Sequence, residues 1–273
     1  MKQILFLLAL ALLFVTGYSQ KPEMVPVEGG TFYLGNDYSG ALDETPEHEV
    51  TISDFRMSKY EVTFEMFDNF CRATGYPFPD DGGFGREKNP VINVSWIGAV
   101  KYCNWLSARF HLTKVYELQI DSTGTVITNI HWDANGYRLP TEAEWEYVAK
   151  GGNDSQGFLY PGSNNAEEVA WYAANSGNKP HQVGTLNANE LGIFDILGNA
   201  WEWCFDYYDA SYYKNSPKQD PRGPSAGQTR VYRGGCFNSS IDQLRVTKRF
   251  SLDPNVEKGT IGIRLVQSGL NDD

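Results

Sequence analysis

Alternation of apolar and polar residues predicts strands in the first third of the chain. Residues 24–35 (MVPVEGGTFYLG) alternate around Gly29 and Gly30, which is a pattern typical of a β-hairpin. A second extended segment is expected at residues 49–60, after a polar loop. The chain is therefore expected to begin its fold with short strands.

Three helices are predicted by apolar periodicity and by capping residues. The first has a single apolar face, made of Phe64, Phe67, Phe70 and Cys71. Ser95 is a favourable N-cap for the second. Thr141 and Glu144 have the spacing of a capping box at the start of the third. Between the last two, residues 115–133 have the pattern of a further hairpin, and after residue 151 short strands alternate with turns.

The composition indicates a chain with many turns and with large aromatic residues in its core. Its 273 residues include 27 Gly and 13 Pro, and 14% are aromatic. No repeat or change of composition marks a linker, so we expect one α+β domain of mixed short strands with a few helices. The net charge of −11 argues against nucleic acid or an anionic membrane as a partner, because phosphates attract clustered Lys and Arg.

The N-terminus has the pattern of a secretory signal peptide. Lys2 precedes an apolar run at residues 4–15, and small residues lead to a cleavage position after Ser19. The run is too short to cross a hydrocarbon layer of about 30 Å. Residues 1–19 are therefore predicted to be a signal peptide, and the protein to be exported to a periplasmic or extracellular compartment without a transmembrane segment in the mature chain.

Several long motifs resemble one family. The most specific are RLPTEAEWE at residues 138–146 and GNAWEW at residues 198–203. RGG at residues 233–235 and GIR at residues 262–264 follow in the same order. The chain resembles the formylglycine-generating enzyme, or sulfatase-modifying factor, family over residues 24–267. The resemblance implies a C-type-lectin-like α+β fold that is low in regular secondary structure.

The family's enzymes oxidise a sulfatase cysteine to formylglycine with O₂ and a copper(I) ion held by two cysteines after the R-G-G-S segment. Soft thiolates select Cu(I). Counting from Arg233 without a gap places Ser239 and Leu244 at those two positions, and counting back from Arg245 places Ile241 at the second. Neither count supplies the cysteine pair, so copper binding is not expected.

Cys236 stands where the family has a serine, and three interpretations are open. It is a buried thiol, or it forms a disulfide with Cys204, which export would permit. In the third, it is a catalytic thiolate with a pKa lowered by a neighbouring cation, for which Arg233 and Arg245 are candidates.

A calcium site is implied by the resemblance. The matching positions are Asp195, Gly198, Ala200 and Glu202. Oxygen ligands on an irregular loop suit Ca²⁺. The alternative is that Glu202 pairs with a nearby arginine while Gly198 and Asn199 form a turn.

Two functions follow from these observations. The first is an exported, calcium-stabilised module without copper-dependent oxidase activity, which binds a peptide, a glycan or a protein partner in a groove built from loops. The second is an oxidoreductase that converts a sulfatase or other peptide cysteine to formylglycine through a rearranged thiol site at Cys236.

Overall fold

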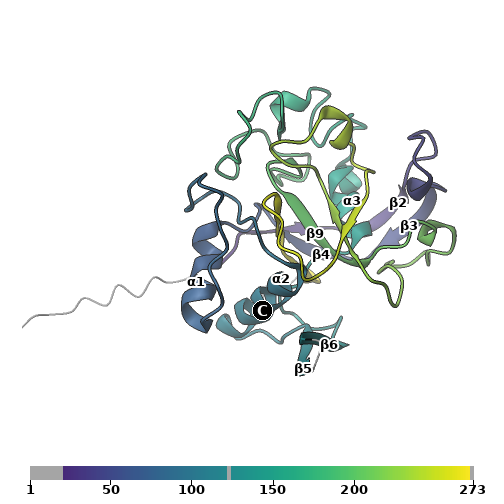
Figure 1. Cartoon of the computed structure of the whole chain (residues 1–273). Coiled ribbons are helices and arrows are strands. Elements are labelled where there is room, and N and C mark those ends of the chain that lie inside the picture. Colours follow the sequence, from purple (N-terminus) through teal and green to yellow (C-terminus); the bar gives the residue numbers. More distant parts are fainter. Residues whose placement is uncertain (1–20, 122–123, 271–273) are drawn as a thin grey trace, which may run out of the picture.

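The computed structural model describes residues 21–121 and 124–270 (Figure 1). The predicted signal peptide at residues 1–19 lies outside the described residues. Within the described residues, no helix has both the length and the apolar character needed to cross a membrane.

A four-stranded sheet lies at the centre of the molecule. Its order is β11-β10-β9-β12, in which β12 pairs with β9 in parallel and the other pairs are antiparallel. The strands are β9 (Trp201–Tyr207), β10 (Arg230–Arg233), β11 (Phe250–Leu252) and β12 (Ile261–Gly262). The first six residues of β9 are all buried, because apolar side chains pack against both of its faces.

A second sheet joins the two ends of the domain. Strand β4 (Phe55–Ser58) pairs with β1 (Met24–Val27) on one side and β13 (Val266–Ser268) on the other. The described residues also form three two-stranded sheets. They are β2 (Gly30–Leu34) with β3 (His48–Ile52), β5 (Tyr116–Asp121) with β6 (Gly124–Ile130), and β7 (Ala170–Trp171) with β8 (Leu197–Gly198).

The hairpin predicted at residues 24–35 is wrong, although both of its strands exist. β1 pairs with β4 and β2 pairs with β3, so the two predicted partners do not pair with each other. Neither Gly29 nor Gly30 has a positive φ, whereas the favoured two-residue hairpin turns need one. A Cβ on Gly29 would lie 2.2 Å from the carbonyl oxygen of Ile52. Gly29 therefore permits a close approach of two segments instead of a turn.

The three predicted helices are confirmed, together with the caps predicted for the second and the third. They are α1 (Phe64–Thr74), α2 (Trp96–Arg109) and α3 (Glu142–Ala149). The side chains of Thr63 and Ser95 cap the first two, and Thr141 and Glu144 form the predicted capping box of α3. Short 3₁₀ helices lie in the loops at Leu42–Glu44, Gly152–Asp154, Ala166–Glu168, Tyr212–Lys214 and Ile241–Gln243.

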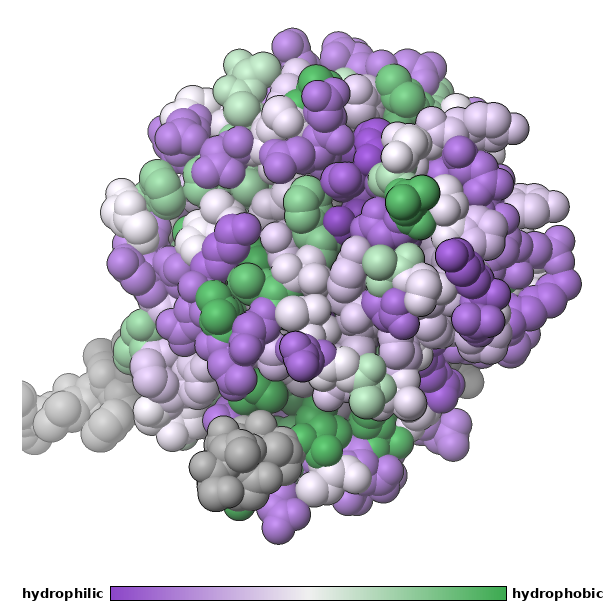
Figure 2. All heavy atoms as spheres, turned by 45° about the vertical axis from the view of Figure 1, so that its right-hand side comes forward, coloured by the Kyte–Doolittle hydropathy of each residue, from purple (hydrophilic) through white to green (hydrophobic). Residues whose placement is uncertain are grey.

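Two hydrophobic clusters meet at strand β9. Trp203 belongs to the cluster that contains α1 and α2, whereas Cys204, the next residue, belongs to the cluster that contains α3. Successive side chains of a strand point to opposite faces, so the helices cover opposite sides of the central sheet (Figure 1). The face in Figure 2 is mainly hydrophilic, with hydrophobic residues in small separate groups.

Candidate functional site

The R-G-G segment makes a tight turn after β10. Gly234 and Gly235 have φ values of 101° and 85°, a conformation that glycine adopts without steric cost. A Cβ on Gly234 would lie 2.8 Å from the carbonyl oxygen of Ile196. Beyond the turn, the amide of Phe237 donates to the carbonyl of Asn199 at 2.9 Å. The turn therefore brings Cys236 and its neighbours beside the G-N-A-W-E-W segment.

Buried ion pairs from α3 hold this turn in place. The Arg233 guanidinium donates to Glu142 at 2.8 Å and to Glu146 at 2.5 Å, and all three side chains are buried. Arg249 donates to both oxygens of Glu142 at 2.8 Å. The glutamates of the R-L-P-T-E-A-E-W-E motif are thus structural anchors, and each has a basic partner. Sequence reasoning missed this network, since Glu142 and Arg249 lie 107 residues apart.

The positions that would hold copper do not fit a copper ion. Ser239 is 2% exposed, and its Oγ accepts the amide N–H of Cys236 at 3.0 Å. Leu244 is fully buried in the hydrophobic cluster that contains α3. Ile241, the alternative second position, is 41% exposed on a 3₁₀ helix. A hydroxyl and an aliphatic side chain cannot replace two thiolates as ligands for Cu(I).

Cys236 has the surroundings of a buried, protonated thiol. Its Sγ lies 3.0 Å from Oδ1 of Asn238, to which it donates, and 3.5 Å from Oγ of Ser239. Burial raises the pKa of the Cys236 thiol, and Ser239 only partly opposes this. The two arginines proposed from the sequence are engaged elsewhere: Arg233 pairs with α3 and Arg245 pairs with Glu44 at 2.6 Å.

The proposed disulfide is not formed in the structure. All four cysteines are free and buried. Cys204 and Cys236 also belong to different hydrophobic clusters. Of the three interpretations of Cys236, the geometry favours the buried thiol.

Glu202, one of the residues expected to bind calcium, has both carboxylate oxygens engaged. One oxygen accepts from Arg264 at 2.7 and 2.8 Å, and the other accepts from the indole N–H of Trp145 at 2.8 Å. Arg264 also donates to the backbone carbonyl of Asp195 at 3.2 Å. Oδ2 of Asp195 accepts the amide N–H of Gly184 at 2.7 Å.

The turn expected in the alternative interpretation is present as well. Gly198 and Asn199 have φ values of 78° and 53°, so both lie in the left-handed region. The amide of Ala200, another of the four expected positions, donates to Glu61. The arrangement around Glu202 is therefore that of a buried ion pair beside a turn.

Glu61 joins this cluster and was not identified from the sequence. Its Oε1 accepts the amide of Ala200 at 2.9 Å, and its Oε2 accepts Nδ2 of Asn199 at 2.6 Å. Glu61, Asp195 and Glu202 are three buried carboxyl groups beside one guanidinium, and burial is the largest cause that raises the pKa of each. Glu61 begins the segment Glu-Val-Thr at residues 61–63, and this pattern alone gives no sign of its buried contacts.

The donor set as arranged does not fit a calcium ion. Calcium takes six to eight oxygen ligands, whereas both oxygens of Glu202 already accept from nitrogen donors. In the described part of the chain, no three His, Cys, Asp or Glu side chains are grouped so that they could hold a metal. Calcium binding by Asp195, Gly198, Ala200 and Glu202 stays a prediction from the resemblance.

Comparison with known proteins identifies the family. The model of the sulfatase-modifying factor enzyme 1-like domain matches residues 14–269. The chaperone protein LppX of Paenibacillus barcinonensis is 35% identical and covers 90% of this chain and 89% of its own length. The formylglycine-generating enzyme of Streptomyces coelicolor is 32% identical, covering 88% of this chain and 87% of its own length.

A solved structure shows the same fold. Treponema denticola variable protein 1 superposes with a TM-score of 0.77 and 32% identity, covering 90% of this chain and 95% of its own. This chain is thus a member of the sulfatase-modifying factor, or formylglycine-generating enzyme, family and has its C-type-lectin-like α+β fold.

Proposed function

We propose that this protein is an exported member of the family that binds polypeptide partners and lacks the copper-dependent cysteine oxidase activity. One observation carries the proposal: the two thiolate positions hold a hydroxyl engaged with the backbone at Ser239 and a buried aliphatic side chain at Leu244. Without a soft ligand pair, there is no site for the Cu(I) that the family's oxidation of cysteine requires.

The choice of a polypeptide partner rests on the relatives. A protein named as a chaperone, LppX, is 35% identical to this chain over nearly its whole length. A chaperone binds other polypeptides, so the same fold supports that kind of function without the oxidase chemistry. Among the peptide, glycan and protein partners expected from the sequence, this likeness favours a polypeptide. Export rests on the predicted signal peptide at residues 1–19.

The rearranged thiol site at Cys236 has less support. A thiol acts as a nucleophile when it is ionised, and burial raises the pKa of Cys236. Arg233 and Arg245 do not offset this effect, because both are paired with glutamates, and the charge of Lys258 lowers the pKa only in part.

The oxidase activity can be tested directly. The protein is incubated with a peptide containing Cys-x-Pro-x-Arg, Cu(I) and O₂, and the peptide mass is measured. We expect no conversion of the cysteine thiol to an aldehyde, whereas the Streptomyces coelicolor enzyme under the same conditions serves as the positive control. Conversion by this protein would overturn the proposal, and loss of that conversion in Cys236→Ser would assign it to Cys236.

Polypeptide binding needs its own measurement. Reduced and carboxymethylated α-lactalbumin, an unfolded polypeptide, is labelled with a fluorophore and titrated with the folded protein. We expect a saturable rise in fluorescence anisotropy that excess unlabelled polypeptide reverses. Saturable binding to a panel of neutral and acidic oligosaccharides, with none to the polypeptide, would replace the proposal with a glycan-binding function.

A further inference from the structure

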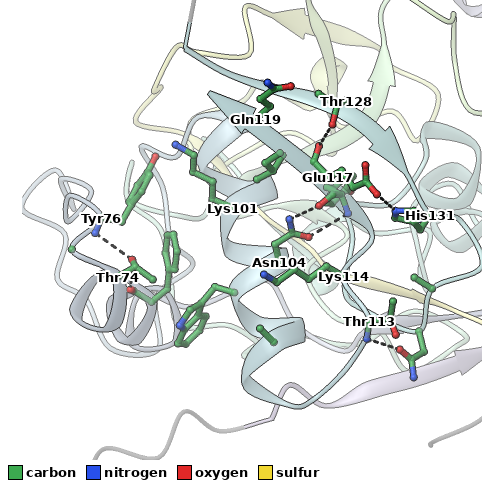
Figure 3. A pocket seen from close by; sticks show the side chains of 18 of the residues that line it. Thr74, Tyr76, Lys101, Asn104, Thr113, Lys114, Glu117, Gln119, Thr128 and His131 are labelled. Carbon is green, nitrogen blue, oxygen red and sulfur yellow. Dashed lines mark hydrogen bonds and ion pairs between the residues drawn. The ribbon is translucent and has the colours of Figure 1, made fainter. Parts of the chain in front are cut away.

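A large open cavity lies away from the candidate site. Its volume is about 1690 Å³, and its walls are the C-terminal end of α1, helix α2 and the β5–β6 hairpin (Figure 3). None of the residues that line it belongs to the R-G-G turn or to the cluster around Glu202. The volume exceeds the roughly 300–1,000 Å³ of small-molecule pockets, which indicates a ligand of several residues.

One edge of strand β5 faces this cavity without a partner strand. The hairpin is a two-stranded sheet, so β5 pairs only with β6 within the described residues. At Tyr116, the side chain of Asn104 on α2 takes the place of a neighbouring strand. It donates to the carbonyl at 2.7 Å and accepts from the amide at 3.3 Å (Figure 3).

The hydrogen bonds of the hairpin indicate which backbone groups of β5 point to this edge after Tyr116. The amide of His131 donates to the carbonyl of Val115 at 2.8 Å, so Tyr116 opposite Ile130 is a pair that is not hydrogen-bonded within the hairpin. Backbone groups alternate in direction along a strand. The register shift after Glu117 adds a residue to β6 and none to β5, so the alternation along β5 is not interrupted. The N–H and C=O of Leu118 and Ile120 therefore point toward the same edge as those of Tyr116.

Aromatic side chains of the two helices form the apolar wall of the cavity. Phe70, Tyr76 and Trp105 line it, and the rings of Phe70 and Trp105 lie 5.6 Å apart between centroids. Tyr76 and Trp105 are only partly buried. An apolar side chain of a bound segment would gain contacts with these rings, at about 25 cal/mol for each Å² removed from water.

The cavity is lined by two lysines, Lys101 on α2 and Lys114 in the loop before β5, and by two acidic residues, Glu117 and Asp133. Neither lysine forms an ion pair with another residue of the described chain. On the hairpin side, Glu117 is already paired with His131 at 2.6 Å (Figure 3). In a protein of net charge −11, this site is suited to an acidic side chain of a partner.

We propose that the cavity binds an extended segment of a partner polypeptide, which adds as a third strand to the outer edge of β5. Main-chain hydrogen bonds to Leu118, which lines the cavity, and to Ile120, which lies just beyond the lining, supply affinity, as in other cases of β-strand addition. An apolar residue packs against Tyr76 and Trp105, and an acidic residue pairs with Lys101 or Lys114. This inference rests on the proposed polypeptide binding and adds where and in which form the polypeptide binds.

The main-chain part is tested with N-methylated peptides. A peptide of about ten residues with alternating apolar and acidic side chains spans more than a typical strand of five or six residues. N-methylation at successive positions removes one donor at a time. We expect the affinity to fall at every second position, because only alternate residues of an added strand donate to β5. Equal effects at all positions, or none, would overturn strand addition.

The charge part is tested with matched variants of the protein. Lys101→Glu is expected to weaken binding of this peptide by about tenfold, which corresponds to about 1.4 kcal/mol. Lys214→Glu changes an equally charged, exposed residue outside the cavity and should leave the affinity unchanged. Circular dichroism of both variants checks that they fold. Equal affinities for the two variants would contradict binding in this cavity.

The outcomes separate this inference from the function on which it rests. If unfolded α-lactalbumin binds but the N-methyl pattern and the effect of Lys101→Glu are absent, polypeptide binding stands and the site is elsewhere. If no polypeptide binds, both fail. Leu118→Pro provides a second check. Proline has no N–H, so it removes the donor that points to the outer edge of β5, and the hairpin makes no hydrogen bond to β6 through that donor. This substitution should weaken binding of the peptide without unfolding the domain.

Discussion

Three buried carboxyl groups share one guanidinium in the interior of this protein. Glu61, Asp195 and Glu202 are each at most 3% exposed, and Arg264 is the guanidinium that they share. Burial of a charge is costly unless a partner compensates it. Three carboxyl groups beside one guanidinium are incompletely compensated, and their pKa values are raised accordingly.

Asp195 offers a test of this imbalance. Burial raises its pKa to about 6, against a usual value of about 3.9 in an unfolded chain. The folded state therefore holds this proton more tightly than the unfolded state. The stability that this bound proton contributes to the folded state is fully present below about pH 4 and is lost as the pH rises through about 6. The loss amounts to about 3 kcal/mol in the free energy of unfolding.

Asp195→Asn keeps an oxygen for the amide of Gly184 and removes the charge. We expect this variant to have a higher free energy of unfolding than the natural protein at pH 7, and a flatter dependence on pH between about 4 and 6. Urea unfolding at several pH values measures both. Asp154→Asn, at an exposed aspartate, is the matched control. A lower free energy of unfolding for Asp195→Asn at pH 7 would contradict the argument.

At the scale of elements, short-range patterns predicted the three helices and the hairpin at residues 115–133 correctly, but not the pairing of β1 and β2. The caps Ser95 and Thr141 act on amides within three residues, so the sequence predicts where the second and third helices begin. Thr63 caps α1 in the same way, although it was not identified from the sequence. The pairing of β1 and β2 depends on segments further along the chain. A strand with alternating apolar and polar residues can pair equally well with the next strand or with a more distant one. β1 and β2 were therefore predicted correctly as strands and wrongly as partners of each other.

The side chain of Asn104 on α2 makes two hydrogen bonds to the backbone of the β5–β6 hairpin at Tyr116. Asn104→Ala removes both hydrogen bonds and leaves the backbone groups of Tyr116 without them. We expect the hairpin to open more readily by about 1–3 kcal/mol and its amides to exchange hydrogen faster. Hydrogen exchange followed by mass spectrometry measures this.

Asn129→Ala supplies the comparison for that experiment. Asn129 is exposed on β6, and its side chain accepts from the neighbouring amide of Ile130. It makes a hydrogen bond within the hairpin but none to α2. Equal acceleration of exchange in the two variants would mean that Asn104 does not hold the hairpin on the helix.

At the scale of the whole molecule, the specific motifs predicted the family and the fold, but not the contacts that hold the site. The motif glutamates and the arginines near the C-terminus are visible in the sequence as charged residues. Their pairing, such as Arg264 with Glu202 across 62 positions, comes only from the fold. The residue types at the two counted copper positions, Ser239 and Leu244, can be read from the sequence alone. The burial of Leu244 and the hydrogen bond of Ser239 come only from the fold.

Calcium is the point at which the resemblance and the geometry disagree, and a melting experiment tests it. A ligand that binds only the folded state raises the melting temperature. Since Arg264 and Trp145 already occupy the oxygens of Glu202, we expect the same melting temperature in calcium chloride and in a chelator. Magnesium chloride controls for a general salt effect. A higher melting temperature in calcium alone would support the site predicted from the sequence, and would mean that Arg264 releases Glu202.

The four buried cysteines make the protein its own reporter of partial unfolding. Cys71 lies on α1, Cys103 on α2, Cys204 on β9 and Cys236 after the R-G-G turn, and burial raises the pKa of every one of these thiols. A thiol-modifying reagent can reach each of them only when its surroundings open. The order in which the four become labelled under native conditions therefore gives the order in which these parts of the fold come apart, without any engineered cysteine.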